Sequence, residues 1–400
     1  MARPARAAVT AGSRSLLTPT IAACLAISGG VHVVIYLLNA TLPLHVVGLG
    51  GSKTQVGLLF ATSTTVSMVL RPLVGGWVDR FGARRVMLPG AAVLIVTLLV
   101  LPLAAVPEHY VALMAGLGCG NGVLATAAGV LVAQASPPGR RGEALSVYFL
   151  ATALSFAAGP PLGLALYGRG GMGACFVAAL VLGGLVALLI LFLKVPVLET
   201  ASPQGFRWFS RRALPAAATV ACVNIGYSSI YAFLPLYALA SGLEGSLGWF
   251  YVLFAICIIT GRLTLRGLSD RIGRARVIVP AVALTMLSYL VLARPPQVPT
   301  LVAAAIMLGA GVAMFYPTLL ALLVDRTPEA ERGSAMGTLS GSFDLGSVLG
   351  SLLVGFTVER VSFAAGFHTA ALGALAGLTL FVATEWRLAR FTRFDARGMM

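Results

Sequence analysis

Long apolar segments, separated by Pro, Gly or charged residues, run through the whole chain. A helix needs about 20 mostly apolar residues to cross the hydrocarbon core of a bilayer. Only 10% of the residues are charged, whereas soluble domains carry about 25%, so the chain cannot cover a water-facing surface. We therefore predict an all-α polytopic membrane protein. Its twelve predicted spans are 17–47, 52–79, 84–105, 108–135, 142–168, 172–194, 212–241, 245–270, 275–293, 299–325, 332–358 and 363–388.

The basic residues predict how these spans are oriented. The net charge is +15, but the Lys and Arg residues stand in short clusters between apolar segments, so we exclude nucleic-acid binding. With the N-terminus inside, 22 of the 28 Lys and Arg residues fall on the cytoplasmic side. This is the positive-inside distribution of membrane proteins. We predict a multi-pass protein of the plasma membrane (the bacterial inner membrane) with both termini cytoplasmic.

The sequence repeats itself at an offset of 191 residues, nearly half of the chain. The repeat predicts two six-helix bundles, 1–194 and 212–400, joined by a central cytoplasmic loop, 195–211, with a short basic tail at the end. Two bundles of the same orientation are parallel repeats, whose interface is the natural place for a binding cavity. The pairs of identical residues are Arg71/Arg262, Gly76/Gly267, Arg80/Arg271, Gly82/Gly273, Arg85/Arg276, Val86/Val277, Gly118/Gly309 and Gly120/Gly311.

The repeated loop also carries a family resemblance. Its first copy has the spacing G-x-x-x-D-R-x-G-x-R-R, made by Gly75, Asp79, Arg80, Gly82, Arg84 and Arg85. This loop resembles the one between spans two and three of the major facilitator superfamily, which implies that family's fold and a transport function. The second copy keeps Asp270, Arg271 and Gly273 but has Arg266 in place of Gly75.

The resemblance implies that these loops close the cytoplasmic side in the outward-facing state, a role that we transfer to Asp79, Arg80 and Asp270. Gly75 has no side chain, so we expect it to permit close helix contact. Arg71 and Arg262 precede their aspartates by eight residues, which is ~12 Å along a helix. Their side chains either snorkel to the cytoplasmic interface or act as gating partners at the inner end of the cavity.

A second resemblance lies in span five. Gly159, Pro160 and Gly163 look like the G-P-x-x-G antiporter motif of exporters in this superfamily, although Leu164 replaces a second Gly. Two features of many proton-coupled exporters are missing, since Ala112 stands at the place of a span-four Arg and span one has no acid. The resemblance therefore implies export by a coupling mechanism that differs from the best-known pattern.

Asp344 is the one acid that we expect deep within an apolar span. A charge at the bilayer centre costs about 3 kcal/mol or more, so Asp344 requires a partner or a water-filled cavity. We predict that it carries a coupling proton or binds a cationic group. The structural alternative is a hydrogen-bonded Asp that caps a helix break around Gly341 and Gly346. His32, which titrates near neutral pH in water, is the second candidate for proton coupling.

Polar residues occupy matching faces of spans one and seven. They recur at i, i+4 and i+7, which is one face of a helix. The repeat directs both faces toward a shared centre, so we predict a substrate cavity; for each residue alone, hydrogen bonding between helices is the alternative. The two faces are His32, Tyr36, Asn39 and Asn224, Ser228, Tyr231. The other predicted cavity residues are Tyr148, Thr152, Tyr227, Tyr316, Phe343 and Asp344.

These features together predict a secondary active transporter that works by alternating access. We expect proton-coupled efflux of small amphipathic or cationic molecules, with metallophore-like zwitterions as a further option. The alternatives are an importer or facilitator of a small polar solute, such as a sugar or an amino-acid-like metabolite, and a non-transporting membrane sensor. Phosphate loops, metal-ligand clusters and nucleophile motifs are missing from the sequence. We expect no enzymatic activity, cofactor or metal, and a monomer whose partners are substrate, protons and the bilayer.

Overall fold

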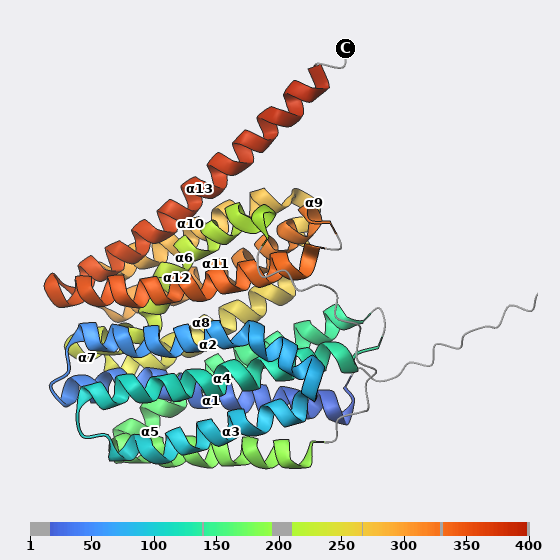
Figure 1. Cartoon of the computed structure of the whole chain (residues 1–400). Helices are drawn as coiled ribbons and strands as arrows, with labels where there is room; N and C mark the ends of the chain where they lie inside the picture. Colours follow the sequence, from blue (N-terminus) through green and yellow to red (C-terminus); the bar gives the residue numbers. More distant parts are fainter. Residues whose placement is uncertain (1–16, 138–139, 194–209, 266, 329–330, 398–400) are drawn as a thin grey trace, which may run out of the picture.

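Every element of the computed structural model is a helix (Figure 1). The structure describes residues 17–137, 140–193, 210–265, 267–328 and 331–397. Most of the predicted central loop, 195–211, lies outside the described residues, so the boundary between the two halves stays a prediction.

The first half begins with helices that follow the predicted spans closely. They are α1 (Pro19–Gly48), α2 (Lys53–Phe81), α3 (Ala83–Val100), the short helix η1 (Leu101–Leu103), α4 (Pro107–Ala135) and α5 (Arg141–Phe192). α5 has 52 residues and contains two predicted spans, because Gly170 and Gly171 leave helical geometry between them. Gly171 has φ 62°, a value that favours glycine because it has no side chain to clash.

The second half contains more breaks than the apolar pattern predicted. Its elements are η2 (Arg211–Ala213), α6 (Leu214–Ala232), α7 (Leu234–Ala240), α8 (Glu244–Thr264), α9 (Leu268–Ile272), α10 (Arg274–Leu292), α11 (Val298–Arg326), α12 (Arg332–Arg360) and α13 (Phe363–Arg397). Span 212–241 is broken at Phe233, just before Pro235, because proline removes a backbone donor. Span 245–270 ends early, at Thr264, because Gly267 adopts a left-handed φ of 77°.

The break at Gly267 corrects one expectation. The ~12 Å between each arginine and its aspartate assumed a continuous helix. That assumption holds in α2, which contains both Arg71 and Asp79. It is wrong for the second copy, where Arg262 lies in the last turn of α8 and Asp270 belongs to α9.

Eleven of the described helices are long and apolar enough to cross a membrane. The predicted number was twelve, and the difference arises because the interrupted helix α5 contains two of the predicted spans. Small residues bring these helices together, as expected for helices packed in lipid.

Close helix contacts recur at the offset of the sequence repeat. At each of these glycines a Cβ atom would overlap a neighbouring helix. In the second half, the matching glycine and the residue that it contacts each lie 191 positions later in the sequence. The two bundles are therefore built alike. The matching contacts are Gly118–Ser63 with Gly309–Phe254, and Gly120–Leu94 with Gly311–Thr285.

The molecule has two ends that differ in charge. We call the end where α2 is followed by α3, α4 by α5, α8 by α9 and α11 by α12 the basic end, and the end with the turns at 49–52 and 241–243 the opposite end. Figure 1 shows α2 and α12 close together near α7, at the opposite end, and diverging toward α9, at the basic end.

Contacts between the halves are tight at the opposite end. Gly57 of α2 packs directly on Ser351 of α12. The backbone N–H of Lys53 donates to the Glu359 carboxylate at 2.6 Å, and its ammonium lies 5.0 Å from the Phe363 ring centroid. The two halves are therefore joined at the opposite end and separate toward the basic end.

Candidate coupling site and substrate cavity

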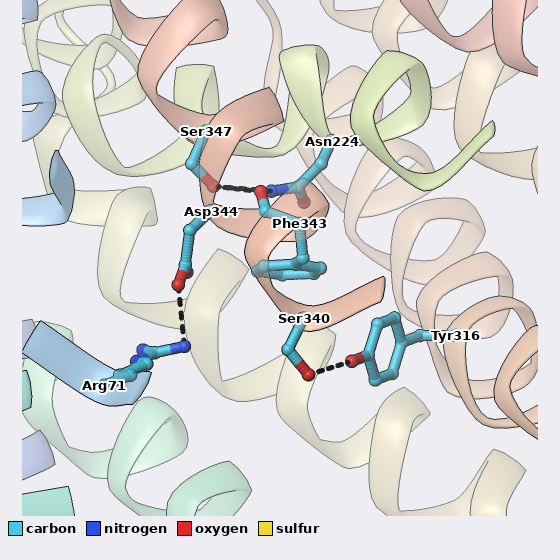
Figure 2. Close-up of polar contacts among 7 residues, drawn as sticks. All are labelled: Arg71, Asn224, Tyr316, Ser340, Phe343, Asp344 and Ser347. Atoms are coloured by element: carbon cyan, nitrogen blue, oxygen red, sulfur yellow. Dashed lines mark hydrogen bonds and ion pairs between the residues drawn. The ribbon is translucent and has the colours of Figure 1, made fainter. Parts of the chain in front are cut away.

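An ion pair joins the two halves near the middle of their interface. Figure 2 shows Arg71 of α2 pointing at Asp344 of α12, and 2.8 Å separates Arg71 Nη1 from Asp344 Oδ2. The Asp344 side chain is only 7% exposed, whereas that of Arg71 is 38% exposed. Arg71 lies ten residues before the end of α2, ~15 Å along the helix. The Arg71 side chain is therefore only partly covered by the rest of the protein at this depth.

The course of α12 excludes the predicted alternative of a helix break at Asp344. α12 is continuous from Arg332 to Arg360, so Asp344 does not cap a break around Gly341 and Gly346. Gly346 instead packs directly against the backbone of Ala221 in α6. Asp344 is therefore a buried acid on an unbroken helix that faces the other half.

Arg262 holds the position in the second half that Arg71 holds in the first. The two arginines are equally far along their helices, counted from Lys53 at the start of α2 and from Glu244 at the start of α8. The residue 191 positions before Asp344 is Ala153, so the repeat supplies no acid for Arg262. Its Nε is buried and has no hydrogen-bond partner, and within the described chain no ion pair reaches its guanidinium.

An aromatic cluster lies beside the ion pair and bridges the halves. Tyr36 of α1 stacks on Tyr231 of α6, with ring centroids 5.7 Å apart and planes at 12°. Phe156 of α5 meets both rings edge-on at 5.1 Å. The Tyr231 hydroxyl donates to that of Tyr227 at 2.7 Å. The further members are Tyr251, Phe254 and Phe343.

The cluster lies nearer the opposite end than the ion pair does. Both α1 and α12 start at the basic end, at Pro19 and Arg332. The helix from Pro19 to Tyr36 is ~26 Å long, whereas the helix from Arg332 to Asp344 is ~18 Å long. The cluster therefore separates the ion pair from the opposite end of the molecule.

The predicted cavity residues of the first half lie in different surroundings. His32 is half-buried beside Tyr36, with its Nδ1 2.8 Å from the Ser28 carbonyl oxygen. Tyr148 is buried within the first bundle, where its hydroxyl accepts from Ser28 at 2.9 Å and donates to the Ala125 carbonyl at 2.6 Å. Tyr148 thus bonds α1 to α4 and α5. Asn39 and Thr152 are half-buried on α1 and α5.

The second-half residues mostly connect α6 with α12. Asn224 donates to the carbonyl of Phe343 and to the hydroxyl of Ser347 (Figure 2). Ser228 is buried against Gly350. The hydroxyl oxygen of Tyr316 in α11 lies 3.4 Å from the Ser340 hydroxyl oxygen, and the Tyr316 ring meets that of Phe343 edge-on. These contacts hold α12, and hence Asp344, in register with α6 and α11.

The repeated loops form their polar contacts within their own halves. Asp79 accepts a hydrogen bond from Gln134 at 3.1 Å, and Arg84 donates to the Leu191 carbonyl at 2.6 Å. Asp270 pairs with Arg274 at 2.6 Å, and Arg274 also reaches Asp325 at 3.1 Å. Arg80, Arg85 and Arg271 are exposed. No ion pair between the two loops is found in the described chain.

The loop glycines divide into two kinds. Gly82 and Gly273 adopt φ values of 84° and 97° between consecutive helices, which favours glycine at both positions. A Cβ on Gly75 would meet no atom within 4 Å. The expectation that Gly75 permits close helix contact is wrong for this conformation, in which the halves have separated at the basic end.

The antiporter-like segment packs α5 on α1. A Cβ on Gly159 would lie 2.7 Å from the Tyr36 Cβ, and one on Gly163 would lie 2.7 Å from the Leu37 carbonyl oxygen. Pro160 lies inside α5. This approach places Tyr36 beside Phe156, which sequence reasoning missed. Its position three residues before Gly159, on the same face of the helix, was the available signal.

Two helical bundles with a charged, aromatic interface at their centre define a polytopic membrane transport protein. The chain belongs to the Major Facilitator Superfamily, whose family model matches residues 21–266 and 244–393. It is a secondary transporter that binds a small-molecule substrate, and its family consists of transporters, not enzymes. The predicted family and fold class are confirmed.

Curated relatives are similar over most of their length. The Staphylopine export protein of Staphylococcus aureus (strain Mu50 / ATCC 700699) is 24% identical over 358 residues, which cover 82% of this chain and 86% of that protein. An uncharacterized MFS-type transporter of Methanocaldococcus jannaschii is 23% identical over 329 residues, covering 79% and 85%.

Solved structures share the fold at low identity. The peptide transporter POT in complex with sulfate matches with a TM-score of 0.76 and 15% identity, covering 93% of this chain and 95% of that one. A mutant of the nucleoside transporter NupG matches with a TM-score of 0.71 and 14% identity, covering 91% and 99%. At these identities the likeness shows the fold alone.

Proposed function

We propose that this transporter is a proton-coupled exporter of small amphipathic or cationic molecules that works by alternating access. The observation that carries the proposal is the Arg71–Asp344 ion pair. It joins the two halves, which must move relative to one another, through a buried carboxylate that can exchange its partner for a proton. Intramembrane acids of this kind mark proton and substrate pathways.

The direction of the cycle depends on orientation. The positive-inside distribution favours a cytoplasmic basic end. In that orientation the contacts of Lys53 and Gly57 with α12 close the extracellular side. The exposure of Arg71 then favours an inward-facing conformation, in which substrate enters from the cytoplasm.

Protons and substrate compete for Asp344 in the proposed cycle. Facing inward, Asp344 is ionised and paired with Arg71, and a cationic group of the substrate replaces that arginine. Facing outward, a proton from outside neutralises Asp344 and releases the substrate. On return, Arg71 stabilises the carboxylate as it loses its proton to the cytoplasm. His32, beside Tyr36, is the second group proposed to carry a proton.

The repeated loops provide the proposed cytoplasmic closure. Asp79, Arg80 and Asp270 would form contacts between the halves in the outward-facing state. The present partners of the two aspartates lie within each half, so closure requires those side chains to exchange partners. We propose that Gly82 and Gly273 assist this closure, because their positive φ values form the turns on which these loops depend.

The substrate class follows from the chemistry of the interface. Aromatic rings suit apolar parts of a substrate, and Asp344 suits a cationic group. The similarity to a staphylopine exporter supports metallophore-like zwitterions within this class. The partial antiporter motif around Gly159 and Pro160 also favours export.

The test is transport in inside-out proteoliposomes with an acidic lumen, using staphylopine, N-benzylglycine and ethidium as probes. We expect gradient-driven accumulation of at least one probe by the unmodified protein. Asp344→Asn should abolish accumulation and also weaken exchange between equal substrate pools, because the cationic group of the substrate loses its carboxylate partner. Glu244→Gln, which removes one exposed charge at the start of α8, is the matched control and should accumulate substrate normally.

Either of two results would overturn the proposal. Accumulation by Asp344→Asn at the unmodified rate would remove the carboxylate from coupling. Transport by the unmodified protein without any dependence on the pH gradient would instead indicate a facilitator of the same substrates.

A further inference from the structure

Arg262 is a half-buried arginine for which the fold supplies no counter-ion. Its Nε is inaccessible to solvent and unbonded, although the equivalent arginine, Arg71, pairs with Asp344 at 2.8 Å. A buried donor without a partner costs about 1–3 kcal/mol, and more when it is charged. Few native groups remain in this condition unless a ligand or another conformation uses them.

The surroundings of Arg262 place it at the interface and not at the lipid surface. It shares its depth with Arg71 through the repeat. It also lies within electrostatic range of Tyr227, a member of the aromatic cluster, as Arg71 does of Tyr36. The two arginines therefore flank the cluster from the two halves.

This region has one more positive charge than negative charges. Arg71 and Arg262 bring two positive charges, and among the described residues Asp344 is the acid that faces them. The guanidinium group has a planar fork of donors that matches a carboxylate. An amphipathic zwitterion could place its ammonium group at Asp344, its carboxylate at Arg262 and its apolar part on the aromatic rings between them.

We propose that Arg262 binds the carboxylate of the transported molecule, so that the substrates are amphipathic zwitterions and not simple cations. This inference rests on the proposed function, because it assumes that the interface is the substrate site. It narrows the substrate class by requiring a carboxylate.

The test compares two probes that differ in one charge, 4-(aminomethyl)phenylacetic acid and its methyl ester, in which an aromatic ring separates the ammonium group from the carboxyl group. Their binding to the purified protein is measured by isothermal titration calorimetry. We expect the acid to bind about 10- to 100-fold more tightly than the ester, as for a hydrogen-bonded charge pair. Arg262→Gln should remove this preference and leave ester binding unchanged, and Arg262→Lys should retain part of it.

Arg276→Gln is the matched control. It removes the same charge from an exposed residue of α10 and should keep the full preference. Retained ester binding shows that each variant is folded. A preference that survives in Arg262→Gln, equal binding of acid and ester to the unmodified protein, or binding of neither probe would each overturn the assignment.

The outcome is separable from the proposed function. Loss of proton coupling with the Arg262-dependent preference intact would overturn only the exporter mechanism. Intact coupling by Asp344 without any carboxylate preference would overturn only the role of Arg262.

Discussion

Arg71 and Arg262 are the same residue at the same depth in two related bundles, yet their environments differ. Arg71 pairs with a buried acid from the other half, whereas Arg262 has a buried Nε without a partner. The difference arises on the facing helices, because Asp344 of α12 corresponds to Ala153 of α5. One substitution between the copies thus separates a charge-paired position from an unpaired one.

The helix contacts do not share this asymmetry. Gly159 packs on α1 near Val33, and Gly350 packs on α6 at Ile225, at nearly the same offset. The repeat therefore preserves the scaffold and varies the polar groups at its centre. A duplicated transporter can in this way keep two bundles that pack alike while each contributes a different charge to the substrate.

The largest expected effect comes from removing either member of the ion pair. Both Asp344→Asn and Arg71→Gln should abolish gradient-driven transport, because the first removes the proposed proton carrier and the second removes the counter-ion that stabilises its ionised form. Their stabilities should differ. Breaking a buried pair costs about 3–5 kcal/mol when a charge is left uncompensated, and Asp344 is the more buried member.

Arg71→Gln should therefore lower the free energy of unfolding more than Asp344→Asn does. Thermal and denaturant unfolding in detergent micelles measures both. Equal destabilisation of the two variants would contradict the assignment of Asp344 as the desolvated partner.

A smaller effect is expected from giving Arg262 a counter-ion. Ala153→Asp should give Arg262 an acidic partner, as Asp344 is for Arg71. That acid should then block access of a substrate carboxylate to Arg262. Binding of 4-(aminomethyl)phenylacetic acid should weaken about 10-fold or more, with the neutral variant Ala153→Asn as control. If Ala153→Asp binds the acid as tightly as the control does, α5 does not face Arg262 as the repeat requires.

Substitution of either of the equivalent glycines should lower stability. Gly350→Ala would press a methyl group on the Ile225 carbonyl and the Ser228 hydroxyl, whereas Gly159→Ala meets mainly the Tyr36 Cβ. Overpacking of this kind costs about 1–3 kcal/mol, and we expect the larger loss for Gly350→Ala because its Cβ would come closer to the Ile225 carbonyl oxygen than the nearest contact of 2.7 Å at Gly159. A ranking in the opposite order from thermal unfolding would show that the α6–α12 contact is the more adaptable.

The smallest effect is expected at the opposite end. Glu359→Gln keeps an acceptor for the Lys53 N–H but removes its charge, and exposed pairs contribute about 0–1 kcal/mol. The ratio of inward-facing to outward-facing molecules, measured by spin-label distances across both ends, should shift no more than about five-fold. A complete switch of conformation would mean that this contact, and not the Gly57–Ser351 packing, holds the end closed.

The spans were predictable where the apolar pattern is uniform and less so where the backbone breaks. α1, α2 and α12 begin and end within about two residues of their predicted spans, within the usual uncertainty of helix ends. The breaks at Phe233 and Gly267 were missed because an apolar segment has the same composition on either side of a kink. Tyr148 shows a related limit, because helix periodicity predicts which residues share a face but not which helix that face contacts.

Sequence alone determined that the chain is an all-helical membrane protein made of two related halves. Lipid leaves every backbone polar group to be satisfied within the chain, so the length of an apolar segment is enough to define a helix. Only the tertiary structure decided that Asp344 pairs with Arg71 and that Arg262 stays unpaired. That choice depends on which helices meet across the interface, through packing at Gly57 and Ser351, between residues far apart in the chain.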